Sequence, residues 1–221
     1  MPSAGHSARR DGKMQGVAEK KHIHDVDRDF RRTGGQMKRR IDVSKLRSAQ
    51  QMLERGVRKY LEILERYHTF GCADAQFQRL FTGFFRVRRD ETWRAAYYRL
   101  FAKYAEANDG LFLLLWDIHS ATGRVEASFA SKILALIDPD RPIWDKYVLK
   151  NLGIKPPAQY LDTGVRIGMI CDKMNTIQKA YERLSARQDM VDALAWFDAD
   201  FPFAREISRM KKMDFLLWAM C

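Results

Sequence analysis

The sequence is poor in the features that mark several large classes of proteins. Its 221 residues contain three cysteines, Cys72, Cys171 and Cys221, which are widely separated and form no CxxC pair. This spacing argues against a disulfide framework, offers no zinc site and is typical of reduced thiols in the cytoplasm. No apolar run reaches the roughly 20 residues that span a bilayer, and residues 1–10 lack the apolar stretch of a secretory signal. We therefore expect a cytoplasmic protein with no membrane partner, no metal and no cofactor.

The motifs of several common enzyme classes are also absent. The chain has no GxxxxGK[ST] phosphate loop, no GxGxxG, no HExxH and no GxSxG. Nucleotide hydrolysis, zinc proteolysis and α/β-hydrolase chemistry are therefore not expected. His22 and His24 form an HxH pair, but no third ligand accompanies them, so the pair does not predict a metal site.

Acidic residues are too few to balance the basic ones, and the formal net charge is +11. A surplus of this size favours a polyanionic partner, because each neutralised phosphate releases condensed counterions. Residues 1–40 are poor in aliphatic side chains and carry +6 of this charge. We therefore predict a disordered basic tail over residues 1–40 and a folded domain over residues 41–221.

Within the predicted domain the apolar residues recur almost throughout with the period of an α-helix, and no useful strand-like alternation appears. Asp42 or Ser44, Asp74, Asp90 and Asp145 are well placed to cap helices. We expect helices over residues 42–71, 74–85, 93–107, 111–120, 125–137, 146–152, 156–186, 188–198 and 204–220. The helix at 111–120 is apolar nearly all round, which predicts burial at the centre of the domain.

The segment from Gly123 to Gly153 resembles the catalytic region of the helix-hairpin-helix (HhH-GPD) DNA glycosylases. Those proteins show a Gly-rich hairpin, a helix that begins with Lys-x-Ala, and a turn that ends in Pro, an apolar residue and the catalytic Asp. Here Ala130 matches the alanine, and Pro142-Ile143-Trp144-Asp145 matches the turn with one extra residue. The resemblance implies an all-α, glycosylase-like core that binds DNA.

Two positions depart from the pattern of that superfamily. Its second hairpin glycine falls near Glu126, although those glycines let backbone N–H groups approach a DNA phosphate. Its bifunctional members have a nucleophilic lysine where this chain has Ser128. The chain therefore resembles the monofunctional members, which use water, although Lys132 lies one turn further along the helix and could substitute.

Further similarity is found to a set of uncharacterised bacterial proteins with an 8-oxoguanine-glycosylase-like fold. Their pattern VE-x-SF-x-SK matches residues 125–132, P-x-WD-x-x-V matches residues around 142–148, and K-x-x-DF-x-LW matches residues 211–218. Together these matches cover roughly residues 75–218. That set implies a fold and assigns no reaction.

The resemblance implies roles for eleven residues, each of which also has a plainer structural interpretation. Asp145 would stabilise a sugar cation or simply cap a helix. Glu126 would be a second acid, or a buried partner of Arg124 or Lys132, and Lys132 would be reactive or merely an exposed helix lysine. Trp116, Trp144 and Tyr147 would line a pocket for a flipped base, or belong to the core. The expected DNA contacts are Gly123, Arg124, Ser128, Lys146 and Lys150.

The sequence thus favours a DNA-binding protein with monofunctional N-glycosylase activity, in which Asp145 stabilises the sugar cation and water completes the reaction. One alternative is a catalytically inactive nucleic-acid or protein interaction module with the same fold. Another is an unrelated helical protein whose basic tail alone contacts anions. Fold similarity by itself does not decide among them.

Overall fold

The computed structural model describes Met37 and residues 39–107 and 110–220, and every regular element within these ranges is a helix. The all-α prediction is therefore confirmed. In the same part of the chain no helix is both long and apolar enough to cross a membrane. The elements are α2 (Val43–Ser48), α3 (Gln50–Phe70), α4 (Ala75–Phe84), α5 (Glu91–Ala107), α6 (Leu111–Thr122), α7 (Ala127–Ile137), α8 (Lys146–Leu152), α9 (Thr163–Ser185), α10 (Gln188–Asp200), the short 3₁₀ helix η1 (Pro202–Ala204) and α11 (Arg209–Ala219).

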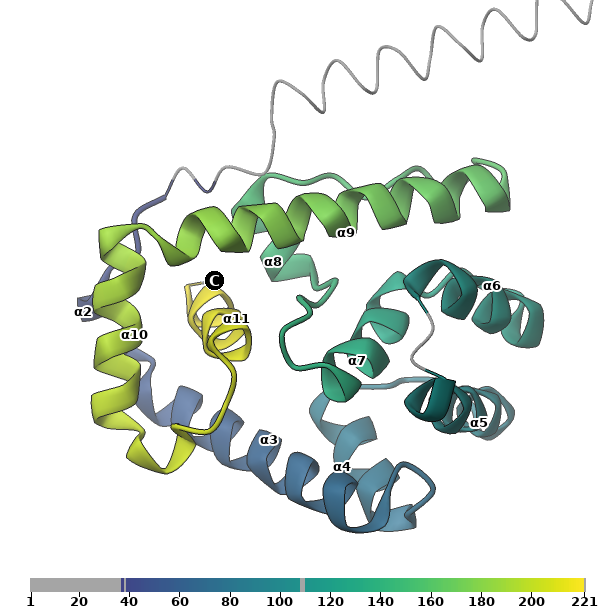
Figure 1. The fold of residues 1–221 in the computed structure, drawn as a ribbon, viewed down its shortest axis with the longest axis horizontal. Helices are drawn as coiled ribbons and strands as arrows, with labels where there is room; N and C mark the ends of the chain where they lie inside the picture. The colour runs from purple at the N-terminus through teal and green to yellow at the C-terminus, as the bar shows by residue number, and fades with distance from the viewer. Residues whose placement is uncertain (1–36, 38, 108–109, 221) are drawn as a thin grey trace, which may run out of the picture.

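The helices form a layered arrangement in which α9 runs along one side of the domain (Figure 1). Helix α9 contacts α6, α8 and α10, so it connects the two ends of the molecule. Helices α3 and α4 pack on each other at the opposite side, and α5, α6 and α7 form a group at one end. Helix α11 lies between α3, α8 and α10 and contacts all three.

The central helix is α11, and this corrects the prediction for the helix near residues 111–120. In α11 all the residues from Lys211 to Leu217 are buried. In α6, by contrast, Phe112 and Leu113 are 48% and 51% exposed. Helix α6 packs on α5, α7 and α9 and lies at one end of the domain, so part of its apolar surface faces outward. Its apolar character therefore did not indicate a central position.

Several helix boundaries follow from side-chain caps and left-handed glycines. Asp42, Asp74 and Asp145 each accept a hydrogen bond from a backbone N–H in the first turn of the next helix, as predicted. Gly123 and Gly153 end α6 and α8 with φ values of 70° and 65°, a conformation that glycine adopts without steric cost.

Three predicted helices differ in their limits. The helix expected over residues 42–71 is divided at Ala49, where α2 ends and α3 begins. The helix expected from residue 156 begins only at Thr163, because Asp162 supplies the cap and the preceding residues form a loop. The final helix begins at Arg209 rather than residue 204, and the Ser208 side chain caps it.

The folded part of the chain begins before the predicted boundary at residue 41. Most of the predicted tail, residues 1–36 and 38, lies outside the described residues. Met37, however, is only 5% exposed, and the Arg187 side chain donates hydrogen bonds to the backbone oxygens of Met37 and Arg39. The Arg39 side chain in turn donates to the Met220 backbone oxygen at 3.1 Å. These contacts join Met37 and Arg39 to the C-terminal helices.

A pair of truncations tests this boundary. We expect the protein that starts at residue 41 to melt roughly 4–8 °C below the protein that starts at residue 37, because it loses a buried methionine and the contacts to Arg187. The measurement is the thermal midpoint of both proteins by circular dichroism. Equal midpoints would show that Met37 and Arg39 add nothing to the stability of the domain.

Candidate functional site

The connection between α6 and α7 is a short hairpin, as the sequence predicted. Gly123 lies in the left-handed region, and its backbone N–H donates to the His119 backbone oxygen at 2.7 Å. Gly123 and Arg124 are exposed, and Val125 is buried. The backbone oxygen of Glu126 then accepts from two N–H groups in the first turn of α7. The hairpin therefore presents Arg124 to solvent.

Glu126 is held in an ion pair that the sequence did not predict. Its Oε1 accepts from Arg89 Nη2 at 2.7 Å and from Arg89 Nε at 3.1 Å. Its side chain is only 13% exposed. The partner is thus neither Arg124 nor Lys132. It is Arg89, which belongs to the turn before α5 that also contains Arg86 and Arg88 (the basic turn). This contact fastens the hairpin to the start of α5.

Ser131, which is 1% exposed, connects α7 to the loop that carries Asp145. Its Oγ accepts a hydrogen bond from the Trp144 backbone N–H at 2.8 Å and donates to the Ser128 backbone oxygen at 3.2 Å. Trp144 is buried, and the next residue, Asp145, is half-buried. Asp145 Oδ1 accepts from the Tyr147 backbone N–H at 2.8 Å and so caps α8. The carboxylate therefore has a position fixed by both α7 and α8.

Lys132 is buried, and its interpretation as an exposed helix lysine was wrong. Only 7% of the residue is exposed, although nothing in the sequence of α7 indicates that this lysine is buried. Its Nζ donates to Ser128 Oγ at 2.6 Å and lies 5.4 Å from the ring centroids of both Phe85 and Phe129. The ammonium thus reaches the side chain of Ser128.

Burial lowers the pKa of Lys132 from 10.5 to about 8. The negative charge of Asp145 opposes this effect, and the positive charge of Lys211 adds to it. More distant contributions come from Asp214 and Glu126, which both favour the charged lysine. Within the described residues Lys132 forms no ion pair with Asp145, so the two are coupled through space.

A second buried polar group lies on α11, next to Lys132. Tyr181 donates to Asp214 Oδ1 at 2.6 Å, and Lys211 Nζ lies 3.5 Å from Asp214 Oδ2. Lys211 Nζ also lies 4.7 Å from the Tyr60 ring and 5.8 Å from the Phe85 ring. Burial raises the pKa of Asp214, whereas Lys211 and the Tyr181 hydroxyl lower it. Lys211 and Asp214 belong to a motif that the sequence had singled out without a role.

The remaining predicted site residues are distributed over several surfaces. Trp116 is half-buried on α6, and a methyl group placed on Gly164 of α9 would lie 3.5 Å from its ring. Lys146 and Lys150 are exposed on α8, and Lys146 Nζ lies 4.6 Å from the ring of Tyr147. Among the described residues no ring contact links Trp116 to Trp144 or Tyr147. The pocket for a flipped base stays a prediction.

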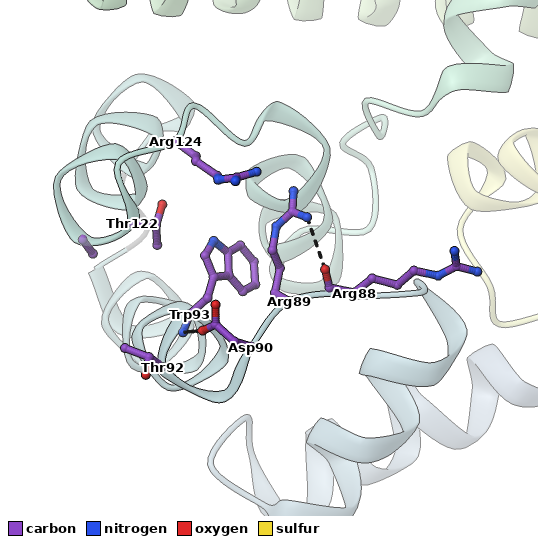
Figure 2. Close-up of a pocket in the computed structure, with 8 residues that line it drawn as sticks. Arg88, Arg89, Asp90, Thr92, Trp93, Thr122 and Arg124 are labelled. Atoms are coloured by element: carbon purple, nitrogen blue, oxygen red, sulfur yellow. Dashed lines mark hydrogen bonds between the residues drawn. The ribbon is translucent and has the colours of Figure 1, made fainter.

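A cavity of about 500 Å³ opens beside the hairpin and not beside Asp145 (Figure 2). Of the predicted site residues only Arg124 lines it. The other lining residues come from the end of α6, the basic turn and the first turn of α5: Arg88, Arg89, Asp90, Thr92, Trp93, Ala121 and Thr122. The sequence signal that could have indicated this cavity is the run of arginines Arg86, Arg88 and Arg89 before Asp90.

The burial of Lys132 predicts a characteristic pH dependence of stability. Because one pKa unit corresponds to about 1.4 kcal/mol, Lys132→Met should raise the free energy of unfolding at pH 7 by up to about 3 kcal/mol. The advantage should shrink between pH 8 and 10.5, since there the native lysine loses its proton while the unfolded chain still binds one. Urea unfolding at pH 7 and pH 10 measures both effects.

The matched control for this experiment is Lys150→Met, which replaces an exposed lysine on α8. Its effect should stay within about 0.5 kcal/mol at both pH values. A Lys132→Met protein that is less stable than the wild type at pH 7, by an amount that does not change with pH, would contradict a buried charge at this position.

The chain was compared with family models, curated proteins and solved structures, and none of them matches it. The similarity to the HhH-GPD glycosylases therefore rests on the residues of the hairpin, α7 and the Asp145 loop. That similarity stays a prediction.

Proposed function

We propose that this protein binds DNA and removes a base by monofunctional N-glycosylase chemistry at Asp145. The observation that carries the proposal is the fixed position of this carboxylate. The Ser131 side chain of α7 binds the backbone N–H of the preceding residue, Trp144, and the Asp145 side chain caps α8. Asp145 is also electrostatically coupled to the buried ammonium of Lys132. The helix, the turn and the aspartate thus occur in the order that the glycosylase pattern requires.

In the proposed reaction the bond between C1′ of the sugar and the base nitrogen breaks, and its electron pair leaves with the base. The sugar carries positive charge until a water oxygen bonds to C1′. One proton of that water stays on the new hydroxyl, and the other neutralises the released base. Asp145 lowers the energy of the cation by its negative charge. Its Oδ1 caps α8, and among the described residues no hydrogen-bond donor is bound to its Oδ2.

Water is the proposed nucleophile because the Lys132 amine is not free to attack. The pKa of about 8 leaves this amine mostly protonated at pH 7, and its ammonium is hydrogen-bonded to Ser128 beside two aromatic rings. We propose that Lys132 instead supplies a fixed positive charge that orients Asp145. Exposed cationic side chains at Arg124, Lys146 and Lys150 supply the contacts to DNA phosphates.

A second candidate function is that of a DNA-binding module without catalysis. One observation favours it, because the cavity of about 500 Å³ lies at the hairpin and none of Asp145, Lys132 or Trp144 lines it. Glu126, the second candidate acid, is engaged by Arg89. Base release by the wild-type protein distinguishes the two functions.

Asp145→Asn is the test of the catalytic role. Asparagine caps a helix about as well as aspartate does, so α8 should persist and the protein should remain folded. The variant lacks the negative charge that the sugar cation needs, so base release should fall by about 100-fold or more. DNA affinity should be equal or slightly higher. The assay is release of free base from duplexes that carry a panel of lesions, followed by alkaline cleavage at abasic sites.

Asp140→Asn is the matched control, since it removes the same charge from an exposed residue of the same loop. It should keep wild-type activity. An Asp145→Asn protein that is as active as the wild type would reduce Asp145 to a helix cap. Absence of base release by the wild type on every substrate would refute the enzyme and favour the binding module.

Reductive trapping tests the choice of water over the lysine amine. If water is the nucleophile, borohydride added during the reaction should leave no covalent protein–DNA complex, since no Schiff base forms. The measurement is a gel shift under denaturing conditions, with Lys132→Gln and Lys179→Gln, which replaces an exposed lysine of α9, run beside the wild type. A trapped complex that disappears only in Lys132→Gln would assign nucleophilic attack to Lys132.

A further inference from the structure

The cavity beside the hairpin is built from two segments that are far apart in the sequence, residues 88–93 and residues 121–124. The turn before α5 supplies Arg89 and Asp90, the first turn of α5 supplies Trp93, and the hairpin supplies Arg124 (Figure 2). The volume of about 500 Å³ lies within the range of pockets that hold small organic ligands. The cavity shares no lining residue with the Asp145 loop.

Trp93 has an unsatisfied hydrogen-bond donor at this cavity. The residue is 6% exposed, and its Nε1 is buried without a hydrogen-bond partner. Figure 2 shows the ring nitrogen facing Thr122 and Arg124. The ring is held between Tyr97, stacked at 4.9 Å, and Phe129, in edge contact at 5.0 Å, so it is not free to turn toward another acceptor. A buried N–H without an acceptor is uncommon, and a ligand oxygen would satisfy it.

The charged side chains around Trp93 differ in whether they are already engaged. Arg89 is bound to Glu126, and Asp90 Oδ1 accepts from the Trp93 backbone N–H at 2.8 Å. Arg88 extends away from the cavity, whereas Arg124 extends over it (Figure 2). Among the described residues no carboxylate pairs with Arg124. The cavity therefore offers a guanidinium and an indole N–H as donors that no protein group uses.

The first turn of α5 also reaches the cavity. Asp90, Thr92 and Trp93 bring the N-terminal end of this 17-residue helix to the cavity wall. The Asp90 carboxylate caps this end and Glu91 lies in the first turn, so the positive charge available at the cavity comes from the arginines. Guanidinium groups bind phosphate oxygens through charge-assisted hydrogen bonds.

We propose that this cavity binds a phosphate ester, with the phosphate oxygens held by the Arg124 guanidinium and the Trp93 indole N–H. The rest of the cavity accommodates the organic group that carries the phosphate. A free nucleotide and the phosphorylated end of a nucleic-acid strand present this same chemistry. Binding at this cavity requires neither Asp145 nor base release, so the phosphate-site proposal can be tested independently of the proposed enzyme activity.

The indole N–H signal of Trp93 reports binding directly in ¹H–¹⁵N spectra of the full-length protein. The chain has five tryptophans, so five indole signals are expected, and a Trp93→Phe sample identifies the relevant one. Titration with inorganic phosphate and then with a nucleoside 5′-monophosphate should shift this signal to saturation. Trp196 is an internal control, because its Nε1 is likewise unpartnered but lies outside this cavity. Its signal should not move.

Two charge-matched variants give the proposal its sharpest test. Arg124→Gln should lower the affinity for the monophosphate at least about tenfold, because a charged hydrogen-bond donor to the phosphate is lost. Arg99→Gln removes the same charge from an exposed residue of α5 that does not line the cavity, and it should leave the affinity within about twofold. Oligonucleotides with and without a 5′-phosphate then show whether a strand end enters the site in place of a free nucleotide.

Three results would overturn the proposal. The first would be a Trp93 signal that does not move at saturating phosphate or monophosphate. The second would be an equal shift in Arg124→Gln, and the third a shift by the unphosphorylated nucleoside as large as that by the monophosphate. Because Arg124 is exposed, its substitution leaves the fold intact, and loss of binding in that variant cannot arise from unfolding.

Discussion

Two buried lysines, Lys132 of α7 and Lys211 of α11, place their ammonium groups near the ring of Phe85. Charges this close in an apolar core are costly unless opposite charges and hydrogen bonds compensate them. Asp214 compensates Lys211 directly, and Asp145 favours the charged form of Lys132 through space. The cost of burying the Lys132 ammonium depends on this balance.

The position of the candidate site follows from the same arrangement. Helix α7 holds Lys132 inward and, through Ser131, binds the backbone just before Asp145. At its other end α7 follows Glu126, which Arg89 fastens to the start of α5. One helix thus connects the hairpin, the buried lysine and the carboxylate. The Asp145 site and the phosphate-binding cavity lie at different parts of this framework, so a ligand in one does not occupy the other.

The sequence predicted the parts of this framework that depend on local geometry. Asp145 as a cap and Gly153 as a helix end follow from backbone groups within a few residues, so their signals were complete in the sequence. Lys132 lies near Phe85 and is affected by the charge of Lys211, both far from it in the sequence, and the partner of Glu126 lies 37 residues away, at Arg89. Such contacts require the tertiary arrangement. The unsatisfied indole N–H of Trp93 also could not be predicted from the sequence, because it is defined by the absence of an acceptor among its neighbours in the fold.

The central claim is that Lys132 carries a buried amine beside Asp145. Its most direct test is the titration of the Lys132 side chain by NMR in the wild-type protein, with Lys132→Met used to assign the signal. The account predicts a pKa of about 8, and removal of the Lys211 charge should raise that value. A pKa near the ordinary 10.5 would place the amine in water and would contradict the arrangement on which the candidate site depends.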